Sequence, residues 1–217
     1  MFGARIEHVL QQVSLLGLAD PDVDASFGGL TRTSLDATTW VDHAPGWLRG
    51  DEVVFEELRN RLTWRQRNVT MYDRRLPEPR LTAWWTPADG PEPLQLLATA
   101  RTLLTARYDE GFDSIGFNCY RDGADSVAWH GDRHRHTVVE PVVAIVSTGT
   151  ARPFRLRPRA GGPSRTFALG HGDLFVMGGA CQHDWEHTVP KVRQAGPRLS
   201  ITFRHGARSG EWSPRSP

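Results

Sequence analysis

The segment WHGDRHRH, residues 129–136, concentrates side chains that could bind a metal ion. His130 and Asp132 are two positions apart, so on extended backbone both side chains point to the same side. A third ligand has to come from elsewhere in the chain, and His187 in WEHTVPK is the best candidate. Two histidines and one carboxylate form the facial triad of non-heme Fe(II) oxygenases, which leaves coordination positions open for O2 and an organic co-substrate.

A solvated loop is the competing interpretation of the same segment. The chain has nine histidines, so a His-x-Asp pair alone is a weak signal. Four further histidines are rival ligands that we expect to be surface or loop residues: His134, His136, His171 and His183. In the metal-site interpretation, Arg133 and Arg135 lie at the rim of the site, near the substrate backbone.

The segment RLSITFR, residues 198–204, could bind an organic acid. Alternation along a strand places Arg198, Ser200, Thr202 and Arg204 on one face and turns Leu199, Ile201 and Phe203 toward a core. Arginine can bind a carboxylate through two parallel hydrogen bonds, so this face suits a dicarboxylate such as 2-oxoglutarate. A solvated edge strand is the alternative. By the same alternation, Asn118 and Tyr120 in FNCY share a face, and Cys119 points to the opposite one.

Two helices and a series of strands must position these residues. Helical spacing of apolar residues predicts helices over 51–64 and 93–109, with a weaker pattern over 5–16. Short β-rich segments separated by Gly, Pro and Asp follow over 114–120, 141–149, 152–158, 164–170, 172–179 and 197–205. This order predicts an α+β, mainly β fold, in which helices pack on a β-sandwich or jelly roll.

The composition is that of a globular domain, with 39% hydrophobic and 24% charged residues. We expect neither a membrane span nor a signal peptide, because the chain has no long apolar run. Its two cysteines, Cys119 and Cys181, cannot form a disulfide framework, so a cytoplasmic location is expected. The net charge is only +1, but residues 130–208 hold twelve basic and five acidic side chains, which permits an anionic partner.

Three segments together resemble the AlkB family of Fe(II)/2-oxoglutarate dioxygenases: NCYRDGADSVAWHGD, GDLFVMGGACQHDWEHTVPK and GPRLSITFR. The shared order, over residues 118–204, is Asn-x-Tyr, His-x-Asp, Trp-x-His-Thr-Val-Pro and Arg-x5-Arg. A looser similarity reaches back to HAPGWL and PRLTAWW. The resemblance implies a double-stranded β-helix, which is a jelly roll, and an oxidative dealkylation of nucleic-acid bases.

The resemblance also implies roles for individual residues. His130, Asp132 and His187 would bind Fe(II). Four residues would hold 2-oxoglutarate, with Arg198 and Tyr120 at its distal carboxylate and Asn118 and Arg204 at its keto-acid end. Ser200 stands where several relatives have Asn, and this difference could alter one hydrogen bond to the co-substrate.

The substrate side of the site is less well defined by the resemblance. Trp85, with Trp84 beside it, falls in the nucleotide-recognition lid at about 65–90, where relatives have an aromatic residue. Arg133 replaces an acidic residue that reads the base in some relatives. The candidates for a residue that fills the gap left in a duplex are Met71, Tyr72 and Leu76.

The expected organisation is an N-terminal extension (1–50), helices and lid (51–115), a catalytic double-stranded β-helix (116–206) and a tail (207–217). We expect a monomer that uses Fe(II), 2-oxoglutarate and O2 on alkylated DNA or RNA, away from membranes. One alternative is a 2-oxoglutarate oxygenase that acts on a small molecule or a protein with the same iron site. The other is a non-catalytic jelly-roll module whose His-rich loop is structural or holds zinc.

Overall fold

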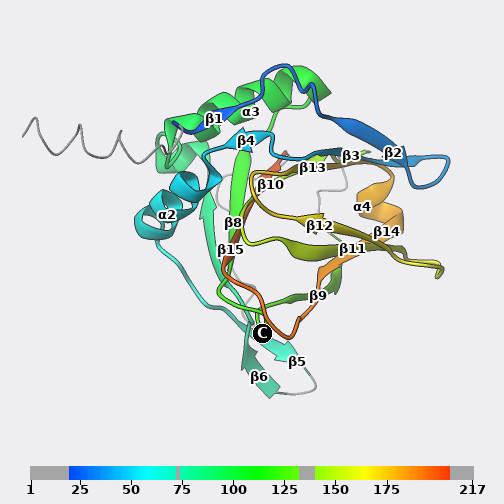
Figure 1. Cartoon of the computed structure of the whole chain (residues 1–217). Helices are drawn as coiled ribbons and strands as arrows, with labels where there is room; N and C mark the ends of the chain where they lie inside the picture. The colour runs from blue at the N-terminus through cyan, green and yellow to red at the C-terminus, as the bar shows by residue number, and fades with distance from the viewer. Residues whose placement is uncertain (1–19, 72–73, 132–139, 206–217) are drawn as a thin grey trace, which may run out of the picture.

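The computed structural model describes residues 20–71, 74–131 and 140–205, and its centre is a sandwich of two antiparallel sheets (Figure 1). The major sheet has the order β2 (Thr31–Ser34), β3 (Thr39–Ala44), β13 (Leu174–Gly179), β10 (Val143–Gly149), β15 (Arg198–Arg204), β8 (Ser114–Tyr120) and β7 (Leu81–Trp85). The minor sheet has the order β12 (Arg165–Leu169), β11 (Arg152–Pro158), β14 (Trp185–Val189) and β9 (Val127–His130). We call the two facing surfaces of these sheets the inner faces.

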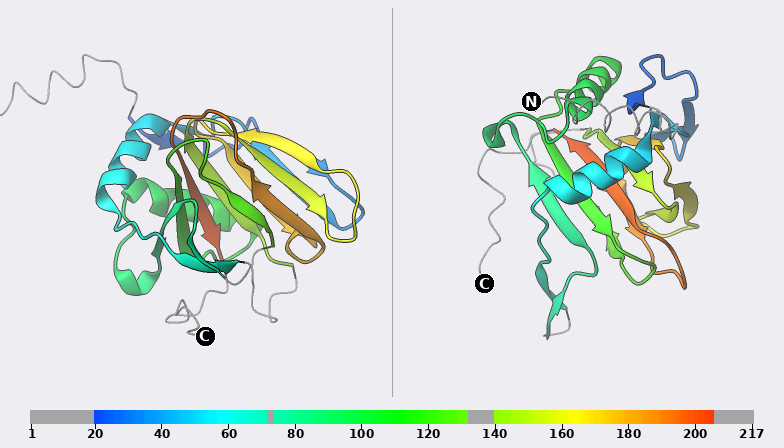
Figure 2. Two further views of the ribbon diagram at one scale, coloured as in Figure 1. Left: turned by 90° about the horizontal axis from the view of Figure 1, so that it is seen from below. Right: turned by 60° about the vertical axis from the view of Figure 1, so that its left-hand side comes forward.

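Two helices cover the outer face of the major sheet, on the side away from the minor sheet (Figure 2). They are α2 (Asp51–Arg61) and α3 (Gln95–Tyr108). The remaining elements are short: β1 (Asp22–Val23) with β4 (Leu48–Arg49), the hairpin β5 (Asn68–Met71) and β6 (Arg74–Pro77), the 3-10 helix η1 (Pro87–Asp89), and α4 (Cys181–Asp184). Among the described residues, no helix has the length and apolar character needed to cross a bilayer.

The predicted fold class is confirmed: the chain is mainly β, a jelly roll with packed helices. Helix α2 ends at Arg61 rather than at residue 64 because Leu62 already has extended backbone, and α3 begins two residues after Pro93. The predicted strands are present, each within about two residues of its expected bounds. The helix expected over 5–16 lies outside the described residues.

The two faces of the major sheet carry two separate apolar clusters. On β15, Leu199, Ile201 and Phe203 pack into the outer cluster with α2 and α3. The alternate residues of β15, which begin with Arg198, therefore point to the inner face. Because β15 lies between β10 and β8, the alternative of a solvated edge strand is excluded.

Several strands were not predicted, and β3 shows why. It pairs with β13 over six positions, although residues 1–50 were expected to form an N-terminal extension. Asp42 of β3 is fully buried and interrupts the apolar pattern. Its carboxylate accepts two hydrogen bonds from Arg32, at 2.7 and 2.8 Å, and one from the Tyr108 hydroxyl at 3.0 Å, so burial of the charge is compensated. Strands β9 and β14, which carry His130 and His187, were also missed.

Candidate active site

The two histidines proposed as metal ligands face each other across the β9–β14 pair. His130 and His187 are Cα partners, and their ring centroids are 4.2 Å apart. His187 is 6% exposed and stacks on Phe154, a member of the apolar cluster between the two inner faces, which we call the inner cluster. The pair therefore points into the sandwich. Asp132, the expected third ligand, and Arg133 lie outside the described residues.

An irregularity in the β9–β14 pairing turns His130 inward. Val127 pairs with Val189 and His130 with His187, so three steps along β9 match two along β14. Strict alternation would put Val127 and His130 on opposite faces, but Val127 also packs against the inner cluster. This bulge resolves the conflict, and bulges commonly redirect side chains beside active sites.

The hydrogen bonding of His130 suits metal binding. Its Nδ1 lies 2.8 Å from the Ala128 carbonyl oxygen, so Nδ1–H is assigned as the donor and Nε2 is left with a free lone pair. Two imidazoles fit the donor set of an Fe(II) site, and a carboxylate is the third group that this set requires. The described residues alone contain no cluster of three His, Cys, Asp or Glu side chains that could hold a metal ion. The rival ligands His171 and His183 are exposed, and His134 and His136 are outside the described residues.

Arg198 is a buried cation on the opposing inner face, that of the major sheet. It is 1% exposed, and its Nε donates to the Leu169 carbonyl oxygen (3.1 Å) while Nη2 donates to Ser147 Oγ (2.6 Å). Its Nη1 has no hydrogen-bond partner among the described residues. The guanidinium lies 5.4 Å from the centre of the Tyr120 ring.

The charge on Arg198 persists in spite of its burial. Desolvation lowers the pKa of its guanidinium to about 10, while the nearby Tyr120 and Asp173 oppose that shift. The group is therefore positively charged at neutral pH, with one unpaired donor in a space that excludes water. Such a group needs an anionic partner, and the distal carboxylate of 2-oxoglutarate is a fitting one.

The other proposed co-substrate residues lie on adjacent positions of the same face. Arg198 pairs with Tyr120 and Ser200 with Asn118 across β15 and β8. Ser200 is nearly buried, and its Oγ lies 3.4 Å from Thr202 Oγ1. The structure therefore brings these four predicted co-substrate residues together on the inner face of the major sheet.

A glycine provides room for two further side chains at the Arg204 end of this face. A Cβ on Gly116 would lie 2.6 Å from Arg204 Nη1 and 2.7 Å from Trp84 Cζ3. The Arg204 guanidinium sits 5.5 Å from the centre of the Trp84 ring. Any larger residue at position 116 would displace both side chains, so Gly116 belongs to the site. Its one signal in the sequence is a glycine within a predicted strand.

Trp84 and Trp85 point to opposite faces, which changes their expected roles. Trp85 is 5% exposed, belongs to the outer cluster under the helices, and donates from Nε1 to the carbonyl oxygens of Gly90 and Pro91, both at 3.1 Å. Trp85 is therefore a core residue, and its side chain is not placed to contact a substrate as expected. Trp84 lies on the inner face beside Arg204 and is the better candidate for substrate contact.

Ser147 was missed by sequence reasoning. It is completely buried on β10, and its hydroxyl oxygen accepts a hydrogen bond from Arg198 Nη2 at 2.6 Å. The signal was available, because Ser147 directly follows the apolar run PVVAIV and lies in the buried part of the strand. A polar residue at such a position usually bonds a specific partner.

Comparison with known proteins agrees with this geometry. The sequence profile of the 2OG-Fe(II) oxygenase superfamily matches residues 85–204. A solved structure described as "The structure of OsALKBH1" matches with a TM-score of 0.56 at 13% identity, covering 80% of this chain and 99% of that one, and shows the same fold.

Two characterised relatives are more similar in sequence. The alpha-ketoglutarate-dependent dioxygenase alkB homolog 3 of Mus musculus is 34% identical over 182 residues, which cover 74% of this chain and 64% of the relative. The DNA oxidative demethylase ALKBH2 of Homo sapiens is 31% identical over 125 residues, which cover 53% of this chain and 48% of the relative. The chain thus spans less than two thirds of the length of these relatives. With the facing histidines and the buried arginine, these matches show that the chain belongs to the 2OG-Fe(II) oxygenase superfamily and, within it, to the AlkB family of Fe(II)/2-oxoglutarate dioxygenases.

Proposed function

We propose that this protein is an Fe(II)/2-oxoglutarate-dependent dioxygenase that removes N-linked alkyl groups from bases of DNA or RNA, releasing an aldehyde, succinate and CO2. One observation carries the proposal: buried Arg198, with an unpaired donor, is on the inner face of the major sheet, and the facing pair His130 and His187 is on the opposing inner face of the minor sheet. The substrate class is supported by the similarity to a DNA oxidative demethylase.

The metal end of the site is held by the minor sheet. His130 and His187, with Asp132 as the expected third ligand, would hold Fe(II), and the hydrogen bond from His130 to Ala128 fixes the orientation of one imidazole. When bound with 2-oxoglutarate and O2, the iron supplies the oxidising power that hydroxylates the N-linked carbon, after which the adduct releases an aldehyde and the unmodified base.

The co-substrate end is held by the major sheet. Arg198 would bind the distal carboxylate with Nη1, because Nε and Nη2 are already used by Leu169 and Ser147. Tyr120 lies against the same guanidinium and closes that side of the site. Arg204 and Asn118 would hold the opposite, keto-acid end. The fixed separation between Arg198 and the pair His130 and His187 would orient the co-substrate relative to the metal.

A base in a nucleic-acid duplex has to be extruded from the duplex to reach the active site between the two protein sheets. Extrusion of a base costs a few kcal/mol, and less for a damaged base. Trp84, half-buried beside Arg204, would recover part of that free energy by stacking on the base, at about 1–3 kcal/mol.

We also propose that the protein acts as a monomer in the cytoplasm. Its two cysteines, Cys119 and Cys181, are both buried free thiols, which supports a reducing compartment. Light scattering after size exclusion tests the oligomeric state, and fractionation of the source cells tests the location.

The activity is tested by anaerobic reconstitution with Fe(II), followed by measurement of succinate and formaldehyde with a methylated oligonucleotide, with and without O2. The His187→Ala variant is the blank. Formaldehyde that requires the oligonucleotide, O2 and His187 supports the proposal. Succinate at the same rate without oligonucleotide, and no formaldehyde, means a different substrate such as a small molecule or a protein. Neither product from the metal-loaded protein contradicts the dioxygenase assignment and favours a non-catalytic module.

A further inference from the structure

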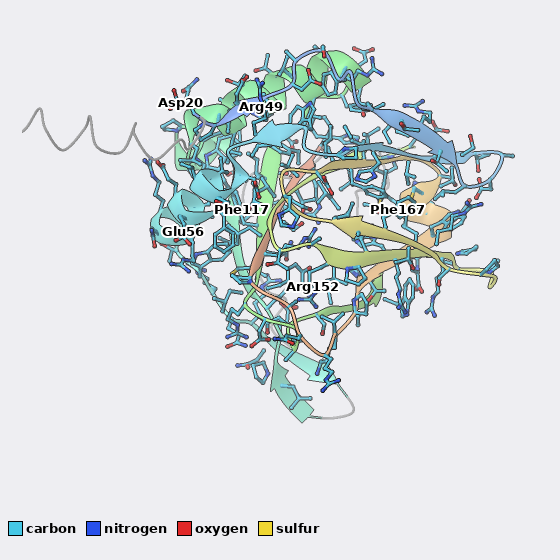
Figure 3. All side chains as sticks on the ribbon, in the orientation of Figure 1. Asp20, Arg49, Glu56, Phe117, Arg152 and Phe167 are labelled. Carbon is cyan, nitrogen blue, oxygen red and sulfur yellow. The ribbon has the colours of Figure 1, made fainter. Side chains whose placement is uncertain are left out.

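A second buried arginine, Arg152, lies outside the roles described so far (Figure 3). It is the first residue of β11 and is 1% exposed. All three hydrogen bonds of its guanidinium go to main-chain carbonyl oxygens: Nη1 donates to Asp122 (2.8 Å), and Nη2 donates to Asp125 (2.8 Å) and Pro190 (2.9 Å). The side chain is therefore anchored to backbone and not to a carboxylate.

The three carbonyl groups belong to the two segments that flank the histidine strands. Asp122 and Asp125 lie in the loop that joins β8 to β9, just before Val127. Pro190 follows directly after Val189, the last residue of β14. Val127 and Val189 are Cα partners, so the guanidinium joins the two strands at the end of the pair opposite His130 and His187.

Further contacts at this end show that the junction is tightly packed. The Thr188 hydroxyl donates to the Val127 carbonyl oxygen at 2.5 Å, and Val192 N donates to the Gly123 carbonyl oxygen at 2.9 Å. A Cβ on Gly123 would lie 2.5 Å from the Val192 carbonyl oxygen, so the loop and the segment after β14 are in direct contact. The Arg152 guanidinium lies at this junction beside Asp125, whose buried carboxylate is paired with Arg121.

The choice of arginine has a physical reason. Guanidinium is planar and has five donors in a rigid arrangement, whereas ammonium is a compact charge on a flexible stem. Three acceptors on two separate segments can therefore be held in one fixed geometry by Arg152, but not by lysine. Burying this charge is costly, since desolvation lowers the pKa of Arg152 and its Nε has no partner among the described residues. A buried charge that is unfavourable for stability indicates a functional role for Arg152.

We propose that Arg152 is a positioning residue for the metal site: by joining the loop before β9 to the segment after β14, it fixes His130 opposite His187 before metal binds. The inference rests on the proposed metal ligands and is independent of the organic substrate. In this role Arg152 acts on the metal site through the two strands. Its guanidinium also lies 5.7 Å from the centre of the Tyr120 ring, so the test is run without 2-oxoglutarate to isolate the metal site.

The test is a titration of the metal-free protein with Co(II), an optical substitute for Fe(II), without 2-oxoglutarate. The variants are Arg152→Lys and Arg152→Met, with Arg155→Met as the matched control, because Arg155 is an exposed arginine of the same strand. Loss of a residue that orients metal ligands typically weakens metal binding about 10- to 100-fold. We expect both Arg152 variants to raise the Co(II) dissociation constant at least about tenfold and to alter the ligand-field spectrum at saturation, which a general loss of stability does not do. Arg155→Met should stay within about twofold of wild type.

Folded Arg152 variants that bind Co(II) as wild type does, with the same spectrum, overturn the role of Arg152 alone. A wild-type protein that binds no Co(II) overturns the proposed metal site as well. If the Arg152 variants do not fold, hydrogen exchange of the metal-free wild-type protein tests the proposal instead. The proposal expects amides of β9 and β14 to be protected in the metal-free protein about as well as those of β10. Rapid exchange in β9 and β14 that slows only after metal is added overturns it.

Discussion

Arg198 is buried and charged and has an unpaired donor. Its proposed role predicts that its removal affects protein stability and 2-oxoglutarate affinity differently. A buried arginine without an anion is a poor contributor to stability, since replacing buried charges by apolar groups is often neutral. A carboxylate that binds it gains about 1.5–3 kcal/mol for each charged hydrogen bond. Stability and 2-oxoglutarate affinity should therefore respond differently to its removal.

We expect Arg198→Met to raise the dissociation constant of 2-oxoglutarate at least about tenfold while the thermal midpoint changes by only a few degrees. The affinity of the metal-free protein for Co(II) should remain within about twofold, because Arg198 is on β15 and the histidines are on β9 and β14. Calorimetric titration with 2-oxoglutarate and a thermal melt measure both quantities. Unchanged 2-oxoglutarate affinity contradicts the assignment.

The two adjacent tryptophans provide a matched pair. Trp85→Ala removes a core side chain and should lower the free energy of unfolding by about 3–5 kcal/mol. Trp84→Ala should change stability less but weaken binding of a methylated oligonucleotide by about 1–3 kcal/mol, the value of one stacked base. Denaturant unfolding and fluorescence anisotropy of a labelled oligonucleotide separate the two effects. If both variants lose only stability, Trp84 is a structural residue too.

At the scale of elements, the hairpin β5–β6 forms a separate two-stranded sheet that projects from the body of the sandwich (Figures 1 and 2). Its base is anchored, because Glu78 N donates to the Arg67 carbonyl oxygen at 2.6 Å and Arg65 pairs with Thr82. Burial lowers the pKa of the Arg67 guanidinium, an effect that Glu78 opposes and Arg80 reinforces. The hairpin therefore leaves the body from a tightly packed, mainly cationic base.

Leu76 on this hairpin is 46% exposed and is the single large hydrophobic side chain that the described residues expose. Of the three candidates for filling the gap in a duplex, the side chains of Met71 and Tyr72 lie outside the described residues.

We expect Leu76→Ala to slow dealkylation of a double-stranded oligonucleotide at least about fivefold, because an apolar side chain inserted between base steps is lost. Activity on a single strand should be nearly unchanged, since no gap has to be filled there. Leu76→Met keeps an apolar side chain of similar size and serves as the control. Equal loss on both substrates means that Leu76 supports the hairpin and does not enter the duplex.

At the scale of the whole molecule, one carboxylate connects the two sheets outside the site. Asp36, in the turn between β2 and β3, accepts hydrogen bonds from Trp185 Nε1 of β14 (2.7 Å) and from the amides of Thr38 (2.9 Å) and Thr39 (2.7 Å). Burial alone would raise its pKa, but these hydrogen bonds outweigh it and lower the pKa to about 2. Trp185 is two residues from His187, so this connection also supports the strand of the second histidine.

The depressed pKa predicts the direction of the pH dependence. The carboxylate titrates near 3.9 in the unfolded chain and near 2 in the folded one, so its contribution is complete above about pH 4 and is lost as the pH falls through 2. Because Asp36 is exposed to solvent, we expect this contribution to be only about 1 kcal/mol.

Urea unfolding of wild type and Asp36→Asn at pH 5, 4, 3 and 2 measures it. The stability difference between the two proteins should be constant from pH 5 to about 4 and should shrink toward pH 2. A difference that stays constant over the whole range would show that the carboxylate is not the group that titrates.

Local patterns determined much of this protein without any structure. Alternation along 198–204 assigned Arg198 to one face and Leu199, Ile201 and Phe203 to the other, because the side-chain direction on a strand depends only on position parity. The same rule separated Tyr120 from Cys119. Apolar spacing located α2 and α3, since each helix buries one continuous face.

Tertiary structure decided what local patterns could not. A bulge directs His130 toward His187, and no rule of strict alternation predicts that. The face of Trp84 and of Trp85 depended on the register of β7 against β8, which pairing with a distant strand fixes. Arg152 reads as one of many arginines in the sequence, and only the fold shows that its guanidinium joins segments far apart in the chain. Sequence thus specified the types of the reactive groups, and long-range strand pairing specified which of them meet.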